Sequence, residues 1–273
     1  MAIDNSFIIK KFETYENLYV LYNQPMNVPF IECDDDTFDD QVYAFTKKEE
    51  AQVWAQPFIK DKYSLIIREI PGKLLKAWLL TVASAGANAV MIQDEGAPVR
   101  VQISQLVTLP DFEKAKEAKI PEANPELQLT MIYFMQQVHR PIERGKAENQ
   151  ELVKLEEEMA HNLMHSRIIV SFDTTNIKGE WNPADPKQHA GIPLIKTGKG
   201  AVYQPVYTEV QEFRKFNMKN PGRTMRLAAV PFTKLPTFLI KESQGMVINP
   251  GGFNYIMNRQ IIDNLIKRYG NID

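Results

Sequence analysis

The stretch VYTEVQE at residues 206–212 decides the fold, because residues 44–50 read AFTKKEE and carry the same pattern. In each stretch an apolar, aromatic ending runs into Thr-x-x-Glu or Thr-x-x-Gln, which is typical of a strand followed by a helix. Nineteen positions after each Thr a second apolar run begins, LII at residues 65–67 and LAAV at residues 227–230. Repetition on this scale predicts that the chain contains one small α/β unit twice.

A third apolar run closes each copy at a turn, VMIQDEG at residues 90–96 and MVINPGG at residues 246–252. Thr46 and Thr208 are each followed, three positions later, by a Glu or Gln side chain. That pattern predicts capping boxes, in which the threonine hydroxyl accepts a hydrogen bond from the first turn of the helix. Both threonines are therefore expected to be helix N-caps at equivalent places.

Strands and helices alternate in both copies, which indicates an α+β fold of two similar small domains, each a mixed β-sheet with helices. Between the copies, apolar residues at helical spacing predict helices over residues 126–139 and 148–165. The expected organisation has three parts, namely a divergent copy at residues 1–124, a helical linker at residues 125–165 and the second copy at residues 166–273.

The composition is that of a globular protein, with 273 residues, of which 44% are apolar and 24% charged. A single cysteine, Cys33, excludes an intramolecular disulfide. The amino end lacks the basic-then-apolar order of a signal peptide, and no apolar run approaches membrane-spanning length. A reduced, cytoplasmic setting without membrane association is therefore expected.

Charge is distributed unevenly along the chain. Residues 1–124 carry 13 basic and 19 acidic side chains, a balance of −6, whereas residues 166–273 carry 15 and 8, a balance of +7. Opposite signs favour mutual attraction of the copies, within one chain or between the chains of a homo-oligomer. The net charge of −2 and the pI of about 6.2 disfavour a nucleic-acid partner.

Several short segments of the second copy have a distinctive order and spacing: PVYT at 205–208, Glu212 with Phe213, AAVP at 228–231 and GMVINP at 245–250. On these residues the second copy resembles the SseB-type domain, named for the enhanced serine sensitivity protein family. The first copy resembles it more weakly, because Gln93 and Asp94 stand where the second copy has Asn249 and Pro250. The resemblance implies a bacterial cytoplasmic protein without an established enzymatic activity, so no catalytic residue and no cofactor can be carried over.

Two histidines, His161 and His165, lie one turn apart on an expected helix. That spacing can place two imidazoles on one metal ion. There is no Glu between them as in a zincin helix, and only His139 and His189 could complete the site. The favoured interpretation is therefore a solvent-facing helix edge, and no metal is expected.

A long loop and a basic segment are the candidate binding elements. Residues 173–191 are too many for a plain connection, and they include Trp181 and His189. Basic side chains that could hold an anion or an acidic partner gather around an Asn-Pro-Gly turn, namely Arg214, Lys215, Lys219, Arg223 and Arg226. A freely varying surface segment is the alternative interpretation of both.

These features predict a non-catalytic protein-interaction or regulatory module with an unidentified protein partner. Trp181 is expected to be an exposed interface anchor. The alternative is an enzyme of unrecognised type, with a site in the cleft between the two copies. Titratable side chains converging in that cleft would distinguish it from a binding module.

Overall fold

The computed structural model describes residues 5–179, 181–182, 185, 188–198, 200–218 and 222–270. The chain forms two compact units, each assembled from two separate segments. Unit 1 consists of Met1–Phe112 and Gln128–Glu156, and unit 2 of Glu113–Leu127 and Glu157–Asp273. The chain thus leaves unit 1, enters unit 2, returns to unit 1 and then enters unit 2 again.

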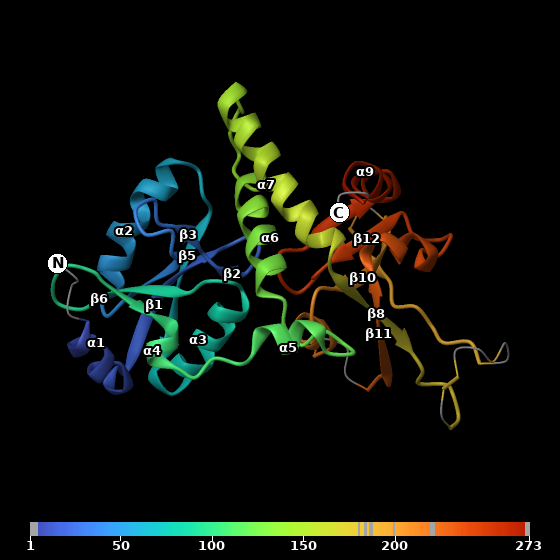
Figure 1. The fold of residues 1–273 in the computed structure, drawn as a ribbon, viewed down its shortest axis with the longest axis horizontal. Helices are drawn as coiled ribbons and strands as arrows, with labels where there is room; N and C mark the ends of the chain where they lie inside the picture. The colour runs from blue at the N-terminus through green and yellow to red at the C-terminus, as the bar shows by residue number, and fades with distance from the viewer. Residues whose placement is uncertain are drawn as a thin grey trace. The chain divides into compact units, whose positions relative to one another are not determined.

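Unit 1 is built on a mixed seven-stranded sheet (Figure 1). Its strands are β1 (Asn17–Asn23), β2 (Val28–Pro29), β3 (Glu32–Cys33), β4 (Asp40–Phe45), β5 (Leu65–Pro71), β6 (Ala89–Gln93) and β7 (Val99–Gln102). β1 pairs antiparallel with β5, β4 and the short β2, while β3 pairs antiparallel with β4. β6 runs parallel to β4, and β7 completes the sheet antiparallel to β6.

Helices cover both faces of this sheet. They are α1 (Ser6–Lys11), the 3-10 turn η1 (Phe12–Thr14), α2 (Lys48–Lys60), the 3-10 turn η2 (Gly72–Leu74), α3 (Leu75–Ser84) and α4 (Ile103–Leu106). Ala51 and Ala55 of α2 pack on Leu21, Tyr43 and Phe45, since alternate strand residues face the same side. α3 lies on the opposite side of the sheet (Figure 1).

The expected pair of central helices is observed as α6 (Pro125–Val138) and α7 (Lys146–Met164). α6 is held to unit 1 by its polar side chains as well as by apolar ones. Gln136 accepts a hydrogen bond from the amide of Ile31 at 3.2 Å and donates one to its carbonyl at 2.9 Å. The hydroxyl of Tyr133 donates to the carboxylate of Asp40 at the start of β4.

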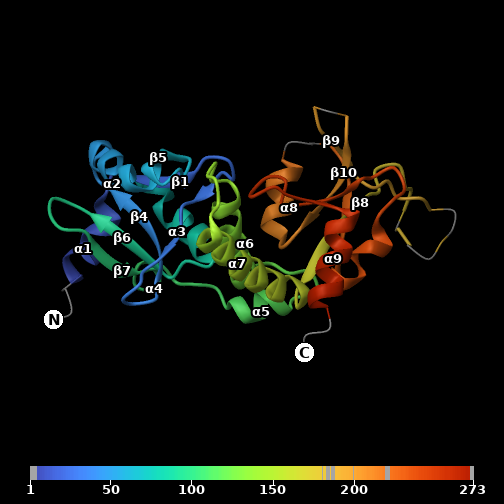
Figure 2. The ribbon, with the colours of Figure 1, turned by 90° about the horizontal axis from the view of Figure 1, so that it is seen from above.

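Unit 2 contains a mixed six-stranded sheet. Its strands are β8 (Arg167–Asp173), β9 (Ile195–Lys196), β10 (Val202–Tyr207), β11 (Met225–Pro231), β12 (Gly245–Ile248) and β13 (Tyr255–Asn258), and its helices are α5 (Phe112–Glu117), α8 (Val210–Asn217), the 3-10 helix η3 (Phe232–Phe238) and α9 (Arg259–Tyr269). The short α8 lies against β10 (Figure 2). There Phe213 packs on Tyr207 and Ile169.

The predicted repeat is confirmed by the strand order. Both sheets follow one path, β5-β1-β4-β6-β7 in unit 1 and β11-β8-β10-β12-β13 in unit 2. In both paths the third and fourth strands are parallel and every other neighbouring pair is antiparallel. The short β3 and β9 likewise pair antiparallel with β4 and β10. The α+β class with two similar sheets is thus established.

The equal 19-residue spacing from Thr46 to Leu65 and from Thr208 to Leu227 does not identify structurally equivalent residues. Leu21 pairs with Ile67, whereas the corresponding residue of β8, Ser171, pairs with Leu227. Ile67 rather than Leu65 is therefore the counterpart of Leu227. The strands are equivalent as predicted and pair in the same register, but the first copy has two more residues between the threonine and the equivalent strand position.

The predicted capping boxes are wrong. α2 and α8 begin one residue later than expected, with Lys47 and Glu209 at the cap positions and no side-chain cap. Each threonine instead bonds to the residue that ends or follows the neighbouring parallel strand. The Thr46 hydroxyl donates to the Gln93 carbonyl at 3.4 Å, and that of Thr208 accepts from the side-chain amide of Asn249 at 2.8 Å.

Candidate functional site

The long loop of unit 2 closes at its base. The amide of Asp173, at the end of β8, donates to the carbonyl of Gly191 at 2.8 Å, and the reciprocal bond is also 2.8 Å. The two residues form an isolated antiparallel bridge. The loop therefore leaves and rejoins the sheet at one point.

The base of the loop is also tied to the start of β11. The amide of Thr174 donates to the Thr224 carbonyl at 2.8 Å, and the Thr224 amide donates to the Thr175 hydroxyl at 2.9 Å. Arg223 forms an ion pair with Asp173 at 3.1 Å. The hydroxyl and amide of Thr175, together with Arg223, hold the pKa of Asp173 below its usual value. The structure thus brings the predicted loop and one end of the predicted basic segment together.

Trp181 is half-buried rather than fully exposed. Its ring lies 5.1 Å from that of Phe172, with 39° between the ring planes. Its indole nitrogen is buried and has no hydrogen-bond partner among the residues that the structure describes. Stacking of this kind contributes about 0.5–1.5 kcal/mol beyond the area buried. Trp181 therefore has an intramolecular platform that its position in a loop did not indicate.

Arg226 lies on the same face of the sheet as this platform. It pairs across the strands with Phe172, and its side chain is exposed. Its neighbours Met225 and Leu227 face the other side, where they pack on the cluster beneath α8. We call Phe172, Trp181 and Arg226 the tryptophan face. His189, exposed and close to Gly191, belongs to the same loop.

The remaining basic residues do not form one patch with Arg226. Arg214 and Lys215 belong to α8, which covers the opposite face of the sheet. Lys215 is paired with Glu212, whereas Arg214 is exposed. Lys219 lies outside the described residues. The basic set is therefore divided between two faces, and two of its cations are already neutralised.

The two candidate metal ligands occupy the last turn of α7 and its end. The rings of His161 and His165 lie 4.4 Å apart, and Nδ1 of His165 is 2.8 Å from the His161 carbonyl. Both side chains are exposed. In the described part of the chain, no group of three His, Cys, Asp or Glu side chains is arranged to hold a metal ion.

Sequence reasoning missed the contribution of Phe172. Phe172 is the last apolar residue of β8, and an apolar residue in a strand is expected to pack in the core. The alternation along β8 could have indicated it, because the buried Ile168 and Val170 lie on the same face. The sequence does not indicate that the loop of residues 173–191 places Trp181 against the sheet face that carries Phe172.

One family model matches a part of the chain that begins in α7 and ends within α9. Residues 147–263 match the family model described as the SseB protein N-terminal domain. The predicted SseB resemblance is thus confirmed for these residues. The match fits a non-enzymatic role and assigns no reaction.

Two solved structures show a weak likeness to the chain. Anabaena Tic22 (protein transport) is 11% identical, with 88% of this chain and 92% of that chain covered and a TM-score of 0.20. Tic22 from Plasmodium falciparum is also 11% identical, with 97% and 99% covered and a TM-score of 0.21. Both TM-scores are low, so neither likeness assigns a function. A search of curated proteins found no match.

Among the described residues, no helix combines the length and the apolar character needed to cross a bilayer.

Proposed function

We propose that this protein is a non-catalytic protein-interaction or regulatory module, and that the tryptophan face of unit 2 is its recognition surface. The observation that carries the proposal is the closure of the loop base by the Asp173–Gly191 bridge and the bonds to Thr224. A loop tied at its base presents its side chains with less ordering on binding than a free loop. The proposal places the module in the cytoplasm, which cell fractionation checks.

The chemistry of the face favours a partner with an acidic and an apolar component. Trp and Arg are the residue types most enriched at interface positions that dominate binding energy. Here a half-buried indole and an exposed guanidinium occur together, and Arg226 has no ion pair with any described residue. A carboxylate on the partner would complete a charge-assisted pair with Arg226. A second copy of this chain, whose first 124 residues are acidic, is one such partner.

The test is capture of partners from native cell extract with intact protein as bait. Trp181→Ala and Arg226→Glu should each lose most of the captured partner. Lys267→Glu, an exposed charge reversal on α9, should capture as much as the wild type. Arg214→Glu distinguishes the two faces of the sheet, because it reverses a charge on α8, which covers the face opposite to the tryptophan face. If Arg214→Glu lost the partner while Trp181→Ala and Arg226→Glu kept it, the recognition surface would lie at α8 and the proposal would be contradicted.

Stability separates a binding role of Trp181 from a core role. Because its ring packs only on Phe172 among the described aromatic residues, Trp181→Ala should lower the free energy of unfolding by about 1 kcal/mol. Urea unfolding measures this change. A loss of cooperative folding would show that Trp181 is core, and the tryptophan face would then lose its role.

A further inference from the structure

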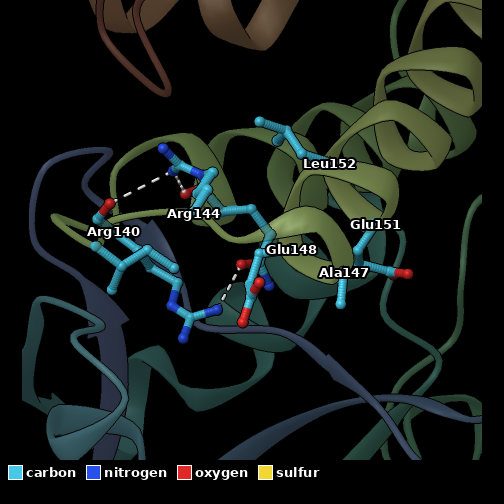
Figure 3. Close-up of a pocket in the computed structure, with 8 residues that line it drawn as sticks. Arg140, Arg144, Ala147, Glu148, Glu151 and Leu152 are labelled. Atoms are coloured by element: carbon cyan, nitrogen blue, oxygen red, sulfur yellow. Dashed lines mark hydrogen bonds between the residues drawn. The ribbon is translucent and has the colours of Figure 1, made fainter.

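A pocket of about 320 Å³ lies in unit 1, where the chain turns from α6 into α7 (Figure 3). Its lining combines two guanidinium groups, two carboxylates and apolar side chains, contributed by Gln137, Arg140, Ile142, Arg144, Ala147, Glu148, Glu151 and Leu152. The volume is at the lower end of small-molecule sites, which run from about 300 to 1,000 Å³. It therefore suits a ligand of a few heavy atoms.

Both arginines are fixed in place by bonds that leave donors free. Arg140 donates from Nε to the Asp61 carbonyl at 2.8 Å and from Nη1 to Gln137 at 2.7 Å, and its guanidinium lies 4.6 Å from the ring centre of Tyr63. Its Nη2 has no bond to any described residue. Arg144 uses only Nη2, which donates to carbonyls at the end of α6. A guanidinium held in this way is preorganised to bind a carboxylate.

The carboxylate of Glu148 supplies the opposite charge. Glu148 extends from the first turn of α7 toward Arg140 in Figure 3, yet it makes no hydrogen bond or ion pair with any described residue. The backbone of Gly145 leaves room for it, since a Cβ there would come within 2.9 Å of its oxygen. An acceptor that none of the described cations neutralises is suited to an ammonium group.

We propose that this pocket binds a small zwitterion of the α-amino acid class with an apolar side chain. The ligand's carboxylate would bind Arg140 and Arg144, its ammonium group would bind Glu148, and its side chain would contact Ile142 and Leu152. A purely anionic ligand is disfavoured by the two lining carboxylates, and a purely cationic one by the two guanidiniums. This site lies in unit 1 and does not depend on the proposed role of unit 2.

The test compares three related probes by NMR titration of the intact, isotope-labelled protein. Leucine carries both charges, 4-methylpentanoate lacks the ammonium group and 3-methylbutylamine lacks the carboxylate. Leucine should shift the amide resonances around residues 137–152 and should bind at least about tenfold more tightly than either analogue, because each charged contact contributes about tenfold or more. Equal binding of leucine and one analogue, or no binding of leucine at millimolar concentration, would overturn the proposal.

A matched pair of variants tests the ammonium contact. Glu148→Gln keeps the shape of the side chain and removes its charge, so leucine affinity should fall about tenfold. Glu143→Gln makes the same change at an exposed residue outside the lining, and the affinity should stay as in the wild type. Both glutamates are exposed, so both variants should unfold at the wild-type temperature. Equal affinity of the two variants would contradict the assigned role of Glu148. The carboxylate contact is tested by the probes because both arginines also hold backbone carbonyls.

Discussion

Asn249 joins the carboxyl ends of the parallel strands β10 and β12 through one side chain. It is fully buried, its φ of 50° lies in the left-handed region, and its Oδ1 accepts from the amide of Thr208 at 2.9 Å. Its Nδ2 donates to the Thr208 hydroxyl. Asn adopts this backbone conformation more readily than most residues. The residue thus fixes the turn after β12 and the entry to α8 together.

Thr208→Ala tests this contact. The change leaves the Asn249 amide buried without that acceptor, so the free energy of unfolding should fall by about 1–3 kcal/mol. Thr208→Ser keeps the hydroxyl and should cost less. Urea unfolding of the two variants gives the comparison. Equal losses would show that the methyl group, not the hydrogen bond, matters at this position.

Asp173 should make stability depend on pH. Its pKa is lowered in the folded protein, mainly by the Thr175 hydroxyl and amide and further by Arg223. The stabilisation is therefore present above the ordinary carboxyl pKa of about 3.9 and is lost as the pH falls through the folded pKa. Asp173→Asn should be less stable than the wild type at neutral pH, and the difference should shrink below about pH 4. A difference that is constant with pH would show that the aspartate charge contributes nothing.

At the scale of elements, β12 and β13 approach each other closely at Gly245. A Cβ there would come within 2.0 Å of the Met257 carbonyl oxygen and 2.7 Å of the Asn258 Cα, both of them backbone atoms. Gly245→Ala should therefore force the strands apart and cost about 1–3 kcal/mol. Gly198→Ala is the control, because nothing lies within 4 Å of its Cβ position. Thermal unfolding of both variants tests the contrast, and similar midpoints would refute the close approach.

One buried side-chain amide, that of Gln136, contributes to the attachment of α6 to unit 1. Gln136→Leu would leave both the amide and the carbonyl of Ile31 without this partner, at about 1–3 kcal/mol for each buried group. Amide hydrogen exchange in α6 should therefore accelerate. Gln150→Leu, at an exposed position of α7, should leave the exchange rates unchanged. Unchanged protection in Gln136→Leu would mean that apolar packing alone holds the helix.

The order of the elements was predictable, and most of their contacts were not. Apolar periodicity located the repeated strands and the two long helices, because burial imposes it on local sequence. The roles of Thr46 and Thr208 were misassigned, because a hydroxyl can cap a helix or bond to a neighbouring strand, and only tertiary structure decides. In the candidate site, the loop and Trp181 stood out by length and composition. The stacking of Trp181 on Phe172 depends on where the loop lies in the folded chain. The division of the basic residues between two faces depends on the register of β11 against β8.

For the whole molecule, the interleaved path of the chain decides which fragments are complete. Asn124 donates from its amide to Glu209 at 2.9 Å and from its side chain to Ser166 at 2.9 Å, and all three residues are buried. A fragment of residues 166–273 lacks Asn124 and should unfold at lower urea concentration than a fragment of residues 113–273. Circular dichroism during urea titration measures both midpoints. Equal midpoints would show that residues 113–127 are dispensable for unit 2.

The same path has a consequence for synthesis on the ribosome. Residues 113–127 emerge before any strand of unit 2, so their partners do not yet exist when they leave the exit tunnel. Unit 1, by contrast, awaits residues 128–156 before its set of segments is complete. Domains generally fold as units, N-terminal first, during translation. Residues 113–127 therefore stay without their unit 2 partners while residues 128–156 are synthesised and unit 1 is completed. Slow or stalled translation after residue 127 would prolong the exposure of residues 113–127.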